Sequence, residues 1–213
     1  MKTIFDSKKE LGGVHYTTKH TGKMRGIFSL STSVFENPFC KKRKELDEGI
    51  CSKCYASRYM KIRSNMEKVF RKNTLILTSE ILPDDKLPLV CNLYFRLEAF
   101  GDLINKKQVI NYFNLCNKNP QTKFALWTKN PQFIHDVIIH DNICKPNNLQ
   151  IIYSSLIINK QGKTKYDFVD KIFTVFDKET AKTVDINCGS KSCITCKLCY
   201  EKNNIKYINE KLK

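Results

Sequence analysis

Ten cysteines in a chain of 213 residues supply its most specific chemistry. In three pairs only two residues separate the thiols, whereas random placement would give roughly 0.4 such pairs; these are Cys51/Cys54, Cys193/Cys196 and Cys196/Cys199. The amino terminus turns polar too early for a secretion signal, and a reducing cytosol disfavours structural disulfides. We therefore expect metal or redox chemistry at these thiols.

The first group is Cys40, Cys51 and Cys54, with ten residues between the first two and two between the last two. Three thiolates can hold a cubane iron–sulfur cluster and leave one iron open to a substrate or cofactor. These cysteines are predicted to follow a first strand and to begin a helix, whose positive end favours the negative charge of a thiolate-bound cluster. Structural zinc with a fourth ligand elsewhere is the alternative.

The second group lies in the run CGSKSCITCKLCY. Four thiols within twelve residues can enclose one ion or one cluster: Cys188, Cys193, Cys196 and Cys199. Tightly spaced CxxCxxC runs are typical of iron–sulfur binding, whereas structural zinc favours two well-separated CxxC pairs. We interpret this group as an iron–sulfur site and keep zinc as the alternative. In a third arrangement, some of these thiols complete the first group's coordination.

The remaining cysteines and the histidines show no ligand spacing. We expect Cys91, Cys116 and Cys144 to be small buried hydrophobic residues, because they lie in or beside apolar segments without a nearby thiol. No HxH or HExxH pattern occurs among the histidines, which we interpret as ordinary surface or core residues; they are His15, His20, His135 and His140.

Strand-like and helix-like segments alternate along the chain. Apolar, β-branched runs predict strands at 24–32, 92–102, 123–129, 149–155 and 171–177, and helical spacing predicts helices at 55–77, 106–117 and from 131 to about 140. Such alternation is typical of parallel βαβ units, in a barrel or a doubly wound sheet. No Pro/Gly/Ser-rich linker divides the chain, so we predict a single domain, 1–213, with an α/β partial barrel at 24–185 and a cysteine-rich cluster-binding segment at 186–200.

The strand at 92–102 predicts polar residues inside the fold. Leu93, Phe95 and Leu97 alternate with Tyr94, Arg96 and Glu98, so the last two are expected to share one face. Both faces of a parallel sheet are usually covered. Arg96 and Glu98 are therefore expected to face a lumen or cleft at the carboxyl end of the strand.

The net charge of +16 raises the possibility of nucleic-acid contact. That indication is weak, because lysines are spread along the whole chain and outnumber arginines 31 to 6. No run of 18 apolar residues occurs, so we expect no membrane span and a cytoplasmic location. With 41% hydrophobic and 27% charged residues, the chain is expected to fold around a core rather than stay disordered.

Four motifs in a fixed order resemble the phage protein family named gene product 88. They are CSKCYA, FRLEAFGDL, KFALWTKNP and the carboxyl-terminal cysteine run. The likeness covers roughly residues 24 to 200 and extends more distantly to phage proteins with a radical-SAM-like barrel. It implies a partial (β/α) TIM-like barrel of five or six mostly parallel strands. Its iron–sulfur ligands would be Cys40, Cys51 and Cys54, and then Cys188, Cys193, Cys196 and Cys199.

The same resemblance implies a cofactor site. In a radical SAM enzyme, Tyr55 would pack beside the cluster, Glu98 and Asp102 would hold the amino group of S-adenosylmethionine, and Arg96 or Lys129 would bind its carboxylate or an acidic substrate. This sequence departs from that pattern, since it lacks CxxxCxxC spacing and a Gly-Gly-Glu run. An ion pair at a barrel mouth would explain the polar residues equally well.

Three functions follow as alternatives. The first is an enzyme with one or two 4Fe-4S clusters that performs SAM-dependent radical or redox chemistry in the host cytoplasm, with an electron donor as partner. The second is an iron–sulfur protein without catalysis, in which the clusters have a structural, electron-transfer or sensing role. The third is a zinc-stapled module that binds nucleic acid.

Overall fold

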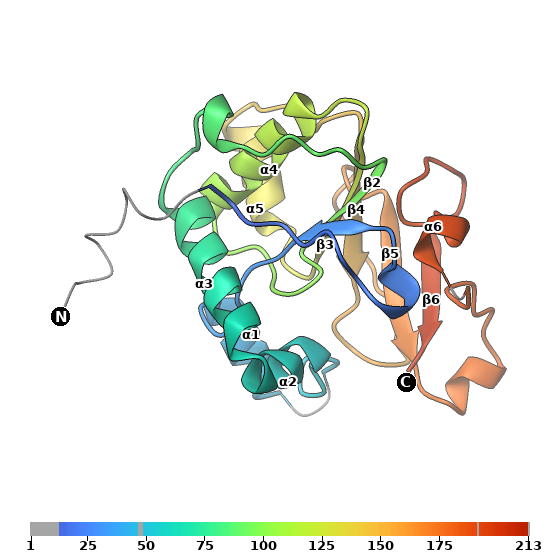
Figure 1. Ribbon diagram of the computed structural model, residues 1–213. Helices are drawn as coiled ribbons and strands as arrows, with labels where there is room; N and C mark the ends of the chain where they lie inside the picture. The colour runs from blue at the N-terminus through green and yellow to red at the C-terminus, as the bar shows by residue number, and fades with distance from the viewer. Residues whose placement is uncertain (1–12, 47–48, 191, 213) are drawn as a thin grey trace.

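The computed structural model describes residues 13–46, 49–190 and 192–212 (Figure 1). Its centre is a six-stranded, all-parallel sheet in the order β1-β2-β3-β4-β5-β6. The strands are β1 (Phe28–Leu30), β2 (Tyr94–Leu97), β3 (Lys123–Thr128), β4 (Leu149–Ser154), β5 (Lys171–Phe176) and β6 (Tyr207–Lys211). The predicted α/β class with parallel strands is confirmed. The sheet is open, since no pairing joins β6 to β1 within the described residues.

Longer helices connect the first strands, and shorter turns connect the later ones. The helices are α1 (Pro38–Lys44), α2 (Tyr55–Ile62), α3 (Ser64–Ser79), α4 (Lys106–Lys118), α5 (Gln132–His135) and α6 (Cys193–Cys196). Short 3₁₀ turns are η1 (Gly22–Met24), η2 (Asp84–Lys86) and η4 (Thr180–Lys182), and η3 (Asp136–His140) is a π-helix. None of the described helices is long and apolar enough to cross a membrane.

Helices α3, α4 and α5 pack on one face of the sheet, which we call the outer face (Figure 1). Alternate strand residues such as Phe95, Leu126 and Ile151 point into this layer and are fully buried. Tyr112 and Phe113 of α4 meet them from the helix side and are also fully buried. This outer layer is the main hydrophobic core of the protein.

The opposite, inner face is covered by the carboxyl-terminal cysteine segment. Tyr94, Ala125 and Ile152 point to this side, because their positions alternate with those of the outer core. Leu198 and Tyr200 pack against them and are 9% and 5% exposed. In Figure 1, α6 accordingly lies on the side of the sheet away from α3 and α4.

Several elements differ from the sequence prediction, and the predicted strands at 24–32 and 92–102 shorten to β1 and β2. The predicted helix at 55–77 is two helices that meet at Arg63. Met60 and Phe70 both enter one small core with Val34, although ten residues span about 15 Å in a straight helix. Strand β6, which no sequence pattern predicts, follows the cysteine-rich segment and pairs with β5.

Candidate metal centres

Cys40, Cys51 and Cys54, which we call the edge thiols, lie beyond the carboxyl ends of β1 and β2. Cys40 belongs to α1, and Cys54 is the N-cap residue of α2. All three are partly buried, and Cys40 and Cys54 pack against the small core that contains Val34. The starts of α1 and α2 therefore place Cys40 and Cys54 against the same small core.

Asn37 connects the first of these helix starts to the loop after β2. Its side chain accepts a hydrogen bond from the amide of Cys40 at 3.3 Å and donates one to the carbonyl of Asp102 at 2.8 Å. Asn37 is fully buried, and Pro38 occupies the first helical position, where its lack of an N–H has no cost. The thiol of Cys40 is thus held at a defined place relative to Asp102.

The loop after β2 needs an unusual backbone. Glu98 and Gly101 have φ values of 56° and 91°. A Cβ at Gly101 would lie 2.2 Å from the hydroxyl oxygen of Thr32, so only glycine fits there. This tight loop places the Asp102 carboxylate beside β3, where it accepts hydrogen bonds from the Thr128 hydroxyl at 2.6 Å and the Lys129 amide at 2.9 Å.

Asp102 and Lys129 set the charge around the edge thiols. Burial raises the pKa of Asp102, and the nearby cation of Lys129 opposes part of this rise. Burial also disfavours the charged form of Lys129. The negative charge of Asp102, with a smaller contribution from Cys51, outweighs the effect of burial, so the pKa of Lys129 lies above its ordinary value. Lys129 therefore favours its charged form at this edge.

Burial disfavours the thiolate form at two of the edge thiols, Cys40 and Cys51. Burial raises the pKa of Cys40, and Asp102 raises it further, while Lys129 lowers it. Burial raises the pKa of Cys51 as well, again opposed by Lys129. A metal would displace these protons, because it binds the thiolate form.

A hollow of about 300 Å³ lies beside the edge thiols. Among the described residues that line it, four are cationic and none is acidic: Arg43, Lys129, Lys163 and Lys165. Its aromatic walls include Phe39, Tyr153 and Tyr166. Arg43 and Lys129 also act on the thiol of Cys51, which joins the hollow to the edge thiols. The sequence drew attention only to Lys129, because no pattern links the other lining residues.

Tyr55 follows Cys54 directly, as the sequence requires, and its hydroxyl donates a 2.5 Å hydrogen bond to the carbonyl of Ala99. Its ring makes an edge contact with Phe100, with centroids 5.5 Å apart. Tyr55 thus ties α2 to the loop that carries Asp102.

Glu98 does not share a face with Arg96, and the predicted placement is wrong. Its positive φ ends the alternation of β2 and turns the carboxylate to the outer side, where it accepts hydrogen bonds from Gln108 and Tyr112 of α4. Glu98 is 3% exposed and also accepts a bond from the Thr32 hydroxyl at 2.9 Å. Burial, partly offset by these bonds, raises its pKa to about 8.

Arg96 lies on the inner face, as the alternation predicts. Its guanidinium carbon is 4.2 Å from the ring centroid of Trp127, a cation–π contact. Tyr55, Cys199 and Cys193 each act to raise the pKa of Arg96, against the effect of burial. Arg96 is therefore near the start of α2 as well as near the carboxyl-terminal cysteines.

The carboxyl-terminal cysteines, which we call the inner-face thiols, gather over the sheet. All four are partly buried in the same apolar cluster that contains Tyr94 and Ile152: Cys188, Cys193, Cys196 and Cys199. The amide of Cys188 donates a 2.9 Å hydrogen bond to Asn209 of β6. Burial is the largest cause that raises the pKa of Cys199 to about 12 and that of Cys188 to about 11.

Two unsatisfied donors on the inner face fit an anionic, sulfur-rich group. The Nε atom of Arg96 and the indole Nε1 of Trp127 are inaccessible to solvent, and neither has a hydrogen-bond partner in the described structure. Buried N–H groups are almost always paired. A thiolate-bound cluster would supply acceptors, and the ammonium group of Lys23, 3.9 Å from the sulfur of Cys188, adds a second cation.

Sulfur separations bear on the choice of metal. In the described part of the chain, no three of these sulfurs lie within 4.8 Å of one another. A single zinc ion with bonds of about 2.3 Å would place its sulfurs about 3.8 Å apart. In both groups the sulfurs therefore lie farther apart than the ligands of one tetrahedral zinc ion would.

The other cysteines divide in an unexpected way. Cys116 is fully buried, as predicted, but Cys91 and Cys144 are exposed, so the prediction for these two is wrong. Among the histidines, His135 and His140 come together with Asp136, which the search for HxH and HExxH spacings could not reveal.

Comparison with known proteins gives one match. The family model described as gene product 88 matches residues 3–211, almost the whole chain. No curated protein and no solved structure matches.

Proposed function

The chain belongs to the gene product 88 family of phage proteins, and from the geometry of its cysteines we propose that it is an iron–sulfur protein on a radical-SAM-like scaffold. Two gatherings of thiols carry this proposal. The edge thiols lie beside Asp102 and Lys129, and the inner face carries two buried donors that have no partner in the part of the chain that the structure describes.

The edge thiols would hold a 4Fe-4S cluster through three cysteines. Such a cluster supplies electrons at low potential and offers one iron without a protein ligand. The adjoining basic hollow suits an anionic cofactor or substrate, because Lys129 and Arg43 can bind a carboxylate or phosphate there. Asp102 orients this edge through Thr128 and could receive an ammonium group. S-Adenosylmethionine, which carries both groups, is the cofactor we propose.

The inner-face thiols would hold a second cluster with four cysteines, a closed site. Their segment occupies the face that would line the lumen of a barrel, with Leu198 and Tyr200 packed onto the strands. This placement favours a structural or electron-transfer role here, and it leaves the carboxyl edge as the place for chemistry. A wholly non-enzymatic iron–sulfur protein is the second candidate.

Metal and sulfide analysis of anaerobically purified protein tests the proposal. We expect brown protein with iron and acid-labile sulfide in equal amounts, about four of each per cluster. The triple variant Cys40→Ser/Cys51→Ser/Cys54→Ser should lose the edge cluster and keep the other. Cys91→Ser and Cys144→Ser, at exposed positions, are the matched controls. Colourless protein that contains only zinc would overturn the proposal.

Activity needs a separate assay. With both clusters reduced, formation of 5'-deoxyadenosine from S-adenosylmethionine would support the enzymatic candidate, and Lys129→Met should reduce it. An intact protein that binds and cleaves no S-adenosylmethionine would support the non-enzymatic candidate. Salt-sensitive retention on DNA by a zinc-containing, iron-free protein would instead support the nucleic-acid module.

A further inference from the structure

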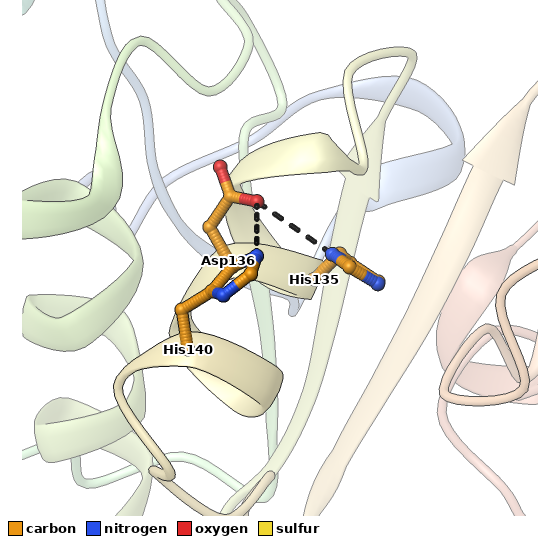
Figure 2. Close-up of side chains that lie close together, drawn as sticks. All are labelled: His135, Asp136 and His140. Atoms are coloured by element: carbon orange, nitrogen blue, oxygen red, sulfur yellow. Dashed lines mark ion pairs between the residues drawn. The ribbon is translucent and has the colours of Figure 1, made fainter.

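Two histidines and an aspartate converge on the outer side of the fold, and the group includes no cysteine. They come from the end of α5 and from the π-helix η3, and Figure 2 shows both imidazole rings turned toward the same carboxylate. The Oδ1 atom of Asp136 is 3.6 Å from Nδ1 of His135 and 4.0 Å from Nε2 of His140. Within the described residues this is the one set of three whose ligand atoms all lie within 4.8 Å of one another.

The π-helix is the reason that these side chains meet. In an α-helix, residues five apart differ by about 140° around the axis and face different ways. Here the amide of Asp141 donates to the carbonyl of Asp136, five residues earlier, at 3.1 Å. The wider turn brings His140 back over His135, with ring centroids 5.9 Å apart. Such π-turns are frequently found at functional sites.

The donor set and its spacing suit one transition-metal ion. Imidazole nitrogens bind zinc, iron, nickel and copper, and two histidines with one carboxylate form a known site for divalent metals with open positions. Bonds of about 2.0–2.1 Å to a tetrahedral ion place ligand atoms about 3.3 Å apart. The observed 3.6 and 4.0 Å require only small side-chain rotations to reach that value.

Two further observations support a ligand at this position. The Nδ1 atom of His135 is inaccessible to solvent and has no hydrogen-bond partner among the described residues. The carboxylate of Asp136 accepts a 2.7 Å hydrogen bond from the amide of Gln132, which itself accepts one of 2.7 Å from the Tyr166 hydroxyl. This chain of bonds orients the carboxylate, as outer partners of metal ligands do.

The surroundings favour an open site. The side chains of His135, Asp136 and His140 are 32%, 27% and 66% exposed, so water could complete the coordination. A simple ion pair between Asp136 and protonated histidines is the competing explanation. It would leave the buried Nδ1 of His135 without a close partner, since 3.6 Å is too long for a hydrogen bond.

We propose that His135, Asp136 and His140 form a site for one divalent transition-metal ion, separate from both cysteine groups and independent of the iron–sulfur proposal.

Titration of the anaerobically purified, full-length protein with Co²⁺ tests this. We expect one bound ion per chain whose spectrum shows d–d bands without the thiolate-to-cobalt charge transfer of a cysteine site. His135→Ala should abolish this binding, and His140→Gln, at an exposed position that folding tolerates, should weaken it at least tenfold. Gln132→Ala should weaken it about tenfold through the outer hydrogen bond.

His20→Ala removes a histidine from elsewhere and is the matched control, expected to bind Co²⁺ as the unaltered protein does. Iron and sulfide contents should stay unchanged in all four variants, which separates this site from the cysteine centres. Unchanged Co²⁺ binding in His140→Gln and His135→Ala, or binding only with thiolate charge transfer, would overturn the proposal.

Discussion

The edge thiols and the inner-face thiols are built from the same residue type but lie in opposite settings. The edge thiols come from turns and helix starts and border a basic hollow of about 300 Å³. The inner-face thiols come from one short segment that is packed onto the sheet by Leu198 and Tyr200. A site that shares its border with a hollow can admit a ligand, whereas a site wrapped by one segment is positioned to hold that segment in place.

The charged and polar side chains beside the edge thiols also differ from those beside the inner-face thiols. In the proposed function, Lys129 and Asp102 at the edge would engage the two charged ends of a small molecule. On the inner face, the buried N–H groups of Arg96 and Trp127 have no hydrogen-bond partner among the described residues. A cluster, rather than a substrate, would accept hydrogen bonds from them. The comparison teaches that spacing predicts which cysteines could be ligands, whereas the neighbouring residues decide what a bound group could do.

The largest expected effect is a difference in stability. Cys199→Ser should lower the free energy of unfolding by at least about 4 kcal/mol. Without the proposed metal, the cysteine segment would no longer hold Leu198 and Tyr200 against the sheet. Cys54→Ser should cost much less. Cys54 caps α2 without a side-chain bond, and serine is a good N-cap worth about 1 kcal/mol. Anaerobic denaturant titration measures both; equal losses would contradict the assigned roles.

Glu98 should make stability fall as pH rises. Its folded pKa of about 8 exceeds the ordinary value of 4.5, so between these values the native state binds more protons than the unfolded chain. The loss over this range is several kcal/mol, since each pKa unit corresponds to about 1.4 kcal/mol. Glu98→Gln should remove this pH dependence of stability and leave the iron content of the edge thiols unchanged. That result would show that Glu98 has no role at the edge thiols. Denaturant titrations across this pH range provide the measurement, with exposed Glu179→Gln as the control.

Arg96→Met should lower the reduction potential of the proposed inner-face cluster by about 60–100 mV, since it removes a cation and the N–H donor from which that cluster would accept a hydrogen bond. The edge centre should shift less, because the thiols that affect the ionisation of Arg96 most are Cys199 and Cys193. Redox titration followed by EPR resolves the two centres in the proposed two-cluster protein. Arg96→Lys, which keeps the charge, should have a smaller effect. Equal shifts at both centres would show that Arg96 does not distinguish them.

The smallest effect is expected for Tyr55→Phe. It removes the hydrogen bond to the Ala99 carbonyl and should cost about 1 kcal/mol of stability. The ring contact with Phe100 stays, so iron content should be retained. Thermal unfolding and iron analysis together check this. Loss of iron would mean that the hydroxyl has a direct role at the edge.

Much of the fold was predictable because period and composition are local properties. The strands at β3, β4 and β5 and the helix α4 lie within a few residues of their predictions, since apolar alternation and helical spacing were clear. Strand β6 was missed because its sequence YINEK is short and polar. Its place in the sheet comes from pairing with β5 rather than from its own pattern.

The candidate site divides in a similar way. Cysteine spacing by itself predicted which thiols form each group, because residues close in sequence cannot be far apart in space. Only the tertiary structure decided which face Glu98 takes, because a positive φ reverses its direction. It also decided that Arg43, Lys163 and Lys165 share a hollow and that His135 meets His140. Such contacts depend on turn geometry and on packing between distant segments, which no local pattern encodes.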